Sequence, residues 1–474
     1  MKRGKELLTN TIIIAIGNFG TKIISFFLIP LYTSILSTKE YGLYDLLVTV
    51  TIFIVPFITL LMEESMFRFL IDCKNDNDKK LVISQTIMFC FMTTIIFTII
   101  YFVLSMFIHI PYKIIFYLYI ISHVIVSLKN SLARGTSNIK IYALSNFIGS
   151  TLIIVLNIIF IAVIKIGISG LLLSYIIGNL VVSIIVFAKL KIQRYISIKE
   201  LNKEKMKNMI NYSIPLVPNS LSWNIVNLSD RVIISSVLGA GANGVYSISY
   251  KFPTLMDTIY GFFYTAWKES AAKTIKDKDS ENFYNKIYIT LKNFMWAVVI
   301  MMICIMPFVF NILVKKDFTE AYIYIPILVL SMYFSNISGY YGGIFTAYKD
   351  TKIMGVTTIL AAITNIVVNI MLIKTIGIWA AALSTLVATG LIYIYRKIKI
   401  KKYVNLTENY KYSLISVISI MISFITYYSK NIILQSCVFV VLLVYCCYIN
   451  KDLIKLIFTI LSKKILKPKL SKKH

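Results

Sequence analysis

The sequence has few charged residues for its length and no long polar segment. Charged residues make up 15% of the 474 residues, whereas hydrophobic residues make up 58%. A soluble chain of this length needs a larger polar surface and divides into several domains. The composition therefore excludes an ordinary soluble protein and predicts a chain that is embedded in a membrane.

Cysteine is scarce, and the motifs that would indicate an enzyme are missing from the sequence. The six cysteines show no CxxC spacing, and most lie in apolar runs, where cysteine behaves as a small hydrophobic residue. No Walker A motif, nucleophile constellation or cluster of metal ligands is present in the sequence. We therefore predict no disulfide, no metal, no cofactor and no enzymatic activity.

Apolar runs recur along the whole chain, and each is long enough to cross a hydrocarbon core of roughly 30 Å. We predict an all-α polytopic membrane protein with about fourteen transmembrane helices. The predicted helices lie at residues 11–36, 43–62, 81–108, 114–128, 141–164, 168–188, 212–238, 245–267, 287–313, 321–346, 353–373, 377–395, 410–428 and 431–449. We expect the fourth of them to extend to Leu132.

The 49 Lys and Arg residues are distributed unevenly among the segments that separate the apolar runs. When the N-terminus is placed in the cytoplasm, most of these residues fall in alternate segments, all of them cytoplasmic. This pattern supports the helix number and places both termini in the cytoplasm. It also explains the net charge of +28 without a nucleic-acid partner, because the cations lie in short loops rather than on a soluble module.

The sequence also contains an internal repeat. Gly42-Leu43-Tyr44 matches Gly244-Val245-Tyr246, and Glu64-Ser65 matches Glu269-Ser270. Each repeat holds six predicted helices, an even number, so both halves insert in the same orientation. Two such bundles can enclose a cavity and expose it to either side in turn, which is typical of a transporter. The predicted domains are two six-helix bundles at 1–190 and 212–395, a basic cytoplasmic linker at 191–211, two further helices at 396–450 and a basic tail at 451–474.

A polar stripe crosses the first predicted helix near the middle of the membrane. Lys22 lies roughly 16 Å along this helix, and Asn18 and Ser25 fall on the same face. A charge at this depth costs about 2.5–3.5 kcal/mol on insertion scales, so it indicates a function. We interpret Lys22 as a cation that faces a cavity, and snorkelling to an interface is the alternative.

The seventh predicted helix carries the matching stripe, with Asn224 and Asn227 followed one turn later by Arg231. Asp230 adjoins Arg231 and would orient it, balance its charge or carry a coupling ion. A structural buried ion pair is the alternative for these two residues. Asp257 in the eighth helix is a second candidate carrier of a proton or Na⁺.

Four further groups of residues complete the candidate site. Lys251 lies near the outer end of the eighth helix, where it either contacts substrate or snorkels. Glu64 and Arg68 are four residues apart at an inner helix end, and Glu269 and Lys273 repeat this spacing; either gate charges or ordinary interfacial ion pairs fit the pattern. Tyr340 and Tyr341, beside three glycines, are candidates for stacking on sugar rings.

Several segments resemble a known transporter family. The segment Gly17–Tyr32, followed by Glu40-Tyr41-Gly42-Leu43-Tyr44, is similar to the start of polysaccharide-exporter proteins. Ser229-Asp230-Arg231-Val232-Ile233, followed by Gly244-Val245-Tyr246-Ser247, resembles the matching motif in their second half. The resemblance covers the whole chain and is to Wzx-type flippases of the multidrug/oligosaccharidyl-lipid/polysaccharide exporter superfamily.

This resemblance implies that the chain moves a polyprenyl-diphosphate-linked oligosaccharide from the inner to the outer leaflet of a bacterial plasma membrane. The product would be a surface polysaccharide such as capsule or O-antigen. Lys22 and Arg231 would contact the diphosphate, and Asn18, Asn224 and Asn227 the sugars. The membrane potential or a returning H⁺ or Na⁺ would supply the energy. Expected partners are the lipid-linked glycan, membrane lipids and polysaccharide-assembly proteins, with no nucleic acid.

Other functions stay open at this point. An ion-coupled multidrug antiporter of the same superfamily should favour acids in its cavity, whereas Lys22 and Arg231 are the deepest charges predicted here. A membrane-embedded glycan polymerase or ligase usually has a sizeable outer loop, and the predicted outer loops are only a few residues long. A lipid scaffold without transport activity is a third alternative. The internal repeat disfavours it, because a scaffold does not require two matched bundles.

Overall fold

The computed structural model describes residues 26–197, 202–275, 277 and 279–455, and these residues form helices and no strands. The helices of the first half are α2 (Ile29–Ile35), α3 (Thr38–Thr59), α4 (Met62–Asp72), α5 (Asp76–Phe107), α6 (Lys113–Gly135), α7 (Ile139–Asn157), α8 (Gly167–Lys189), α9 (Lys203–Ser213) and α10 (Leu216–Val237). The later helices are α11 (Ala240–Thr274), α12 (Ser280–Leu313), α13 (Ile325–Ala347), α14 (Lys352–Ile376), α15 (Trp379–Ile400), α16 (Tyr410–Ser429) and α17 (Ile432–Ile449). A π-helical turn extends α7 over Ile158–Val163, and short 3₁₀ segments lie at Ile192–Arg194 and Lys316–Tyr324.

The helices confirm the predicted all-α membrane fold. Every predicted segment from 43–62 onward coincides with a described helix, and the end of the segment 11–36 coincides with α2. In the described part of the chain, 10 helices are long and apolar enough to cross a membrane. The chain is therefore a multi-pass α-helical membrane protein.

Two short helices, α4 and α9, lie where the sequence predicted cytoplasmic loops. Both carry charged residues, so neither forms an apolar run long enough to span a membrane. Their apolar faces are nevertheless buried: Met66 and Met209 pack with Val82 and Leu132 in one hydrophobic cluster. An amphipathic helix of this kind is stabilised by tertiary packing, which a search for long apolar runs does not detect.

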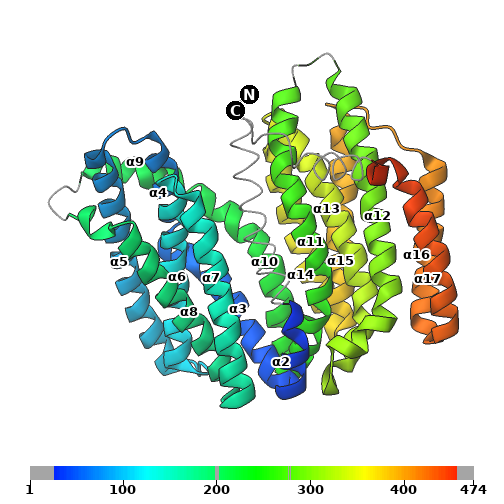
Figure 1. Cartoon of the computed structure of the whole chain (residues 1–474), viewed down its shortest axis with the longest axis horizontal. Coiled ribbons are helices and arrows are strands. Elements are labelled where there is room, and N and C mark those ends of the chain that lie inside the picture. The colour runs from blue at the N-terminus through cyan, green and yellow to red at the C-terminus, as the bar shows by residue number, and fades with distance from the viewer. Residues whose placement is uncertain (1–25, 198–201, 276, 278, 456–474) are drawn as a thin grey trace, which may run out of the picture. The chain divides into compact units, whose positions relative to one another are not determined.

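The chain divides into two compact units (Figure 1). Unit 1 comprises Met1–Ile248, Val314–Phe318 and Asn365–Ala381, and unit 2 comprises Ser249–Leu313, Thr319–Thr364 and Ala382–His474. In unit 1, α6 and α7 both pack along α8, and α3 packs along α10. In unit 2, α12 packs against α13, α16 and α17. The domain boundaries predicted from the repeat stay a prediction.

One pair of matched repeat residues meets inside unit 1. A Cβ atom added to Gly42 in α3 would lie 1.8 Å from the Ala240 carbonyl oxygen and 2.5 Å from the Gly244 backbone nitrogen. The Asn243 side chain donates a hydrogen bond to the Gly42 carbonyl at 2.7 Å. Only glycine permits this approach of two backbones, as in other tightly packed membrane helices.

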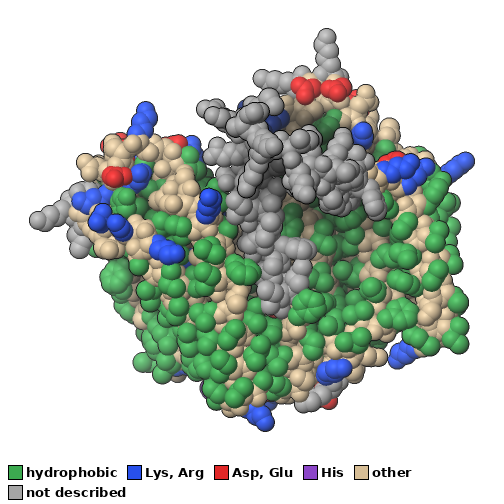
Figure 2. Space-filling view, viewed as in Figure 1, with side chains coloured by type: hydrophobic (Ala, Val, Ile, Leu, Met, Phe, Trp, Pro, Cys, Tyr) green, Lys and Arg blue, Asp and Glu red, His purple; other side chains and the backbone are tan. Residues whose placement is uncertain are grey.

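The helix surfaces present apolar side chains outward. Ile99 in α5 and Met371 in α14 are 61% and 71% exposed. Figure 2 shows apolar side chains along the sides of the helices, and Lys and Arg mainly near the helix ends. A continuous apolar surface of this kind is stable against lipid tails rather than water.

Candidate functional site

A buried ion pair joins α3 to α10 in unit 1. Arg231 Nε donates to Asp45 Oδ2 at 2.6 Å, and the two side chains are only 10% and 9% exposed. Arg231 Nη1 also donates to the Asn227 carbonyl oxygen at 3.0 Å. The sequence predicted a contact between Arg231 and its neighbour Asp230, but the carboxylate in contact with the guanidinium is Asp45, which the sequence analysis did not single out.

Asp230 has its own set of partners in unit 1. The Tyr246 hydroxyl donates to Asp230 Oδ2 at 2.9 Å, and Asn369 Nδ2 donates to Oδ1 at 2.9 Å. Asp230 is 2% exposed, and the Asn369 Oδ1 atom is buried without a hydrogen-bond partner in the described part of the chain. Carboxylate and amide oxygens are the ligands that hard cations take, so this group fits a proton or a hard cation.

The structure describes only some of the other residues in the predicted polar stripes. Lys22, Asn18 and Ser25 lie outside the described residues. Asn224 and Asn227 lie in α10, and both side chains are half-buried. Their predicted contact with sugars stays a prediction.

In unit 2, Tyr340 and Tyr341 are fully buried in α13. The Tyr340 ring stacks on the Trp267 indole with 4.4 Å between centroids, and its hydroxyl donates to the Tyr284 carbonyl oxygen at 2.7 Å. The Tyr341 hydroxyl lies 3.0 Å from the Tyr288 hydroxyl. Since protein side chains cover these rings, stacking on a sugar would require them to move.

Two predicted ionisable residues of α11 also lie in unit 2. The Asp257 side chain is half-buried and interacts with the Asn336 side chain of α13. Lys251 is half-buried, and its ammonium group has no hydrogen bond or ion pair within the described residues. Asp257 therefore has a polar neighbour for its carboxyl group, as a proton carrier requires.

The predicted gate charges have different partners from those expected. Glu64 accepts a hydrogen bond from Arg134 of α6 at 3.0 Å, and Arg68 pairs with Asp72 at 2.6 Å. The i, i+4 spacing of Glu64 and Arg68 permitted a pair, but tertiary packing places Arg134 beside Glu64. Lys273 is exposed in α11, and the Glu269 side chain lies outside the described part of the chain.

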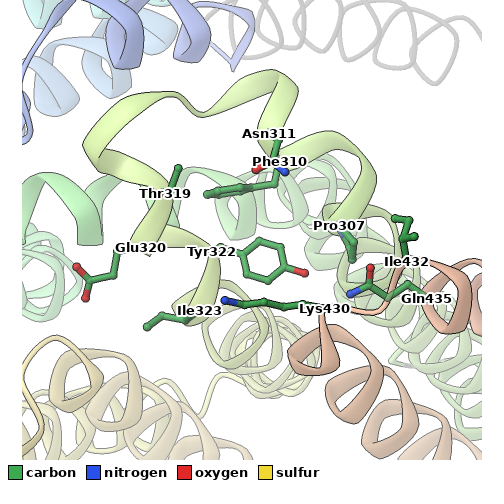
Figure 3. A pocket seen from close by; sticks show the side chains of 10 residues that line it. All are labelled: Pro307, Phe310, Asn311, Thr319, Glu320, Tyr322, Ile323, Lys430, Ile432 and Gln435. Atoms are coloured by element: carbon green, nitrogen blue, oxygen red, sulfur yellow. The ribbon is translucent and has the colours of Figure 1, made fainter.

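A cavity of about 590 Å³ lies in unit 2 near one end of α12. It is lined by Pro307, Phe310, Asn311, Thr319, Glu320, Tyr322, Ile323, Lys430, Ile432 and Gln435. Figure 3 shows the Tyr322 ring between Phe310 and Lys430. The Tyr427 hydroxyl donates to the Tyr322 carbonyl oxygen at 2.6 Å, which ties the 3₁₀ segment to α16. None of the predicted site residues that the structure describes lines this cavity.

Comparison with known proteins places the chain in a family. A family model described as "Polysaccharide biosynthesis protein" matches residues 7–268, more than half of the chain. The chain belongs to this polysaccharide biosynthesis family. The match confirms the resemblance to polysaccharide exporters of the Wzx type that the sequence indicated.

Solved structures share the fold of this family member at low sequence identity. The lipid II flippase MurJ in an inward closed conformation has a TM-score of 0.72 at 16% identity, covering 94% of this chain and 100% of that chain. An inward-facing multidrug resistance MATE family transporter of the MOP superfamily has a TM-score of 0.60 at 16% identity, covering 80% and 98% of the two chains. The shared fold is that of membrane transporters and flippases.

A relative from the archaeon Methanocaldococcus jannaschii is described as "Uncharacterized membrane protein MJ1375". It is 23% identical over 307 residues, which are 60% of this chain and 71% of that protein.

Sequence reasoning missed a buried cation of the family member in unit 2. Arg396 is 1% exposed, although the predicted helix 377–395 ended just before it. Its guanidinium donates to the Thr357 hydroxyl at 2.9 Å, the Ser338 carbonyl oxygen at 3.1 Å and the Met354 carbonyl oxygen at 3.4 Å. The helix α15 extends beyond its apolar run, so hydropathy alone gave no signal for this residue.

Proposed function

We propose that the chain flips a polyprenyl-diphosphate-linked oligosaccharide from the cytoplasmic to the outer leaflet of a bacterial plasma membrane. Membership of the polysaccharide biosynthesis family carries this proposal. The fold shared with a protein described as a lipid II flippase supports it. The chain would lie in the plasma membrane with both termini in the cytoplasm and act with membrane lipids and polysaccharide-assembly proteins.

The ion pair of Arg231 and Asp45 supports a role for Arg231 in binding the diphosphate. A guanidinium forms bidentate hydrogen bonds to phosphate as well as to carboxylate. In the proposed cycle the diphosphate replaces Asp45 as the partner of Arg231, and Asp45 neutralises the cation when no substrate is bound. This exchange limits the cost of an unpaired buried charge. Lys22 is the second proposed cation.

The Asp230 group supports a proposed coupling site. Asp230 would take up H⁺ or Na⁺ in one conformation and release it in the other, with Asn369 and Tyr246 holding its carboxylate. Asp257, beside Asn336, is the alternative carrier in unit 2. A transmembrane potential would contribute about 2.3 kcal/mol per charge and 100 mV to the export of an anion.

A second candidate function is ion-coupled export of drugs. The fold shared with a MATE family transporter favours it, because that protein is described as a multidrug resistance transporter. A cavity for cationic drugs needs uncompensated acids, whereas Asp45 is paired with Arg231. A deletion strain that becomes sensitive to cationic drugs and keeps its surface glycan would support this function instead.

The first experiment is a gene deletion with complementation, followed by analysis of lipid-linked intermediates and surface polysaccharide. Loss of surface glycan with accumulation of lipid-linked units on the cytoplasmic side is the expected result. The variant Lys22→Gln/Arg231→Gln should then fail to restore export at a normal protein level. Adding Asp45→Asn to this variant removes the carboxylate that Arg231 balanced. If export is still lost, the loss reflects substrate binding rather than the unbalanced charge of Asp45. The exposed Lys374→Gln is the matched control. Normal export by the double variant would contradict the role of the two cations.

A further inference from the structure

Glu63 is a buried acidic residue that the proposed transport cycle does not use. It lies in the first turn of α4 and is 5% exposed. Its neighbours Met62 and Met66 belong to the hydrophobic cluster that also contains Cys90 of α5. The Glu63 Oε2 atom is buried and has no hydrogen-bond partner among the described residues.

Two cations on helices that pack against α4 contact other groups. Arg134 of α6 donates to Glu64 at 3.0 Å, and Lys205 of α9 lies over the Phe69 ring, 5.0 Å from its centroid. Cys90 faces Glu63 from α5, and the Thr59 hydroxyl faces it from α3. Glu64 adds a like charge beside it. Within the described part of the chain, no cation pairs with Glu63.

Burial in this cluster raises the pKa of Glu63, and the negative charge of Glu64 raises it further. The backbone N–H of Glu63 and the Thr59 hydroxyl act in the opposite direction and do not cancel the effect of burial. A carboxylate in an apolar cluster without a cation is costly, so the neutral acid is the form that fits here.

The chain just before Glu63 is strained. Leu60 and Leu61, which join α3 to α4, have φ angles of 47° and 53°. Bulky residues seldom adopt the left-handed conformation, and they keep it only where the surrounding packing requires it. The packing of α4 against α5, α6 and α9 is therefore what holds this junction, and Glu63 lies at its start.

We propose that Glu63 is a proton-binding site that controls the packing of α4 in unit 1. The protonated side chain stays in the methionine-rich cluster and holds the Leu60–Leu61 junction. Ionisation draws the carboxylate toward water and loosens α4. By the predicted orientation α4 lies on the cytoplasmic side, so this device would make the conformation of unit 1 sensitive to cytoplasmic pH.

The test compares two adjacent glutamates in the purified full-length chain. Because the folded-state pKa of Glu63 is raised above its usual 4.5, Glu63 destabilises the fold increasingly as the pH rises through that folded-state value. Glu63→Gln should therefore raise Tm by about 2–4 °C at pH 8 and change it little at pH 5. The neighbouring Glu64→Gln, which loses its charge pairing with Arg134, should show no such gain. An equal response of both variants would overturn the proposal.

A second measurement uses hydrogen exchange and infrared spectroscopy. After correction for intrinsic rates, the amides of α4 should exchange faster at pH 8 than at pH 6 in the wild type, and this difference should vanish in Glu63→Gln and Glu63→Met. The infrared band of a protonated carboxyl group should disappear in Glu63→Gln and persist in Glu64→Gln. If Glu63→Gln removes no band of a protonated carboxyl group at any pH at which the protein stays folded, the proposed proton site is refuted.

Discussion

Arg231 in α10 and Asp45 in α3 form a buried ion pair with 2.6 Å between Nε and Oδ2. The two residues are 186 positions apart in the chain. They lie on α10 and α3, which pack along each other in unit 1. Both side chains are buried, so removal of either one breaks an ion pair in a poorly solvated site.

Asp45→Asn should lower the free energy of unfolding by about 3–5 kcal/mol, because it removes the carboxylate that pairs with Arg231 in a poorly solvated site. Asp45→Asn/Arg231→Gln should recover part of this loss. The measurement is thermal unfolding in detergent, followed by size-exclusion chromatography of the fluorescently tagged protein. Asp72→Asn, at the exposed pair with Arg68, is the control and should change little. If the losses of Asp45→Asn and Arg231→Gln add up in the double variant, the two residues are not coupled.

Asp230→Asn should abolish export while the protein still folds, because the amide keeps the shape of the carboxyl group but cannot carry a coupling ion. Tyr246→Phe is the matched control: it removes one hydrogen bond to Asp230, at a cost of about 1–3 kcal/mol, and leaves the charge in place. Export in cells and protein level are measured together. Normal, ion-dependent export by Asp230→Asn would exclude Asp230 as the carrier.

Arg396→Lys should lower the free energy of unfolding by about 2–4 kcal/mol, since an ammonium group cannot reach the acceptors on α13 and α14 that the planar guanidinium contacts. The measurement is again thermal unfolding in detergent. Lys399→Gln, exposed on the same helix, should leave the stability unchanged. If the two substitutions have the same small effect, the hydrogen bonds of Arg396 do not stabilise unit 2.

Glu408, in the loop before α16, should make unit 2 less stable in acid. It contacts Lys292 at 2.9 Å and Lys397 at 2.6 Å. Burial would raise the pKa of Glu408, but the hydrogen bonds from Lys397 and Lys292 lower it to about 2. The stabilisation, about 1–3 kcal/mol, is thus present above pH 4.5 and is lost as the pH falls toward 2.

The check on Glu408 is the pH dependence of the Tm of Glu408→Gln. Its deficit relative to the wild type should be largest at pH 7 and should shrink as the pH falls below 4.5. Glu204→Gln, exposed on α9, is the control without a deficit. A deficit that stays constant from pH 7 to pH 3 would indicate a purely steric effect.

Gly42→Ala should destabilise unit 1 by about 1–3 kcal/mol, because the added methyl group overlaps the Ala240 carbonyl oxygen. Gly261→Ala in α11 is the matched control, since a Cβ there meets nothing within 4 Å. That control should leave stability unchanged or raise it by up to about 1 kcal/mol, as expected for alanine in a helix. Thermal unfolding of the two variants distinguishes close backbone packing from a general intolerance of glycine replacement.

The sequence by itself determined the all-α membrane fold and the positions of the apolar helices from residue 43 onward, because about 20 consecutive apolar residues satisfy the bilayer wherever they occur. It also indicated Arg231, Asp230 and Asp257 as candidate functional residues, because a charged side chain inside the membrane is energetically costly. The repeat brought Gly42 and Gly244 to attention, and in unit 1 their backbones lie against each other.

Only the tertiary structure decided which groups meet. Arg231 pairs with Asp45 rather than Asp230, Asn369 binds Asp230, and α15 buries Arg396 beyond its apolar run. These contacts join residues that are 39 to 186 positions apart. The physical reason is that hydropathy is a local property, whereas the partner of a buried polar group depends on which helix faces pack together.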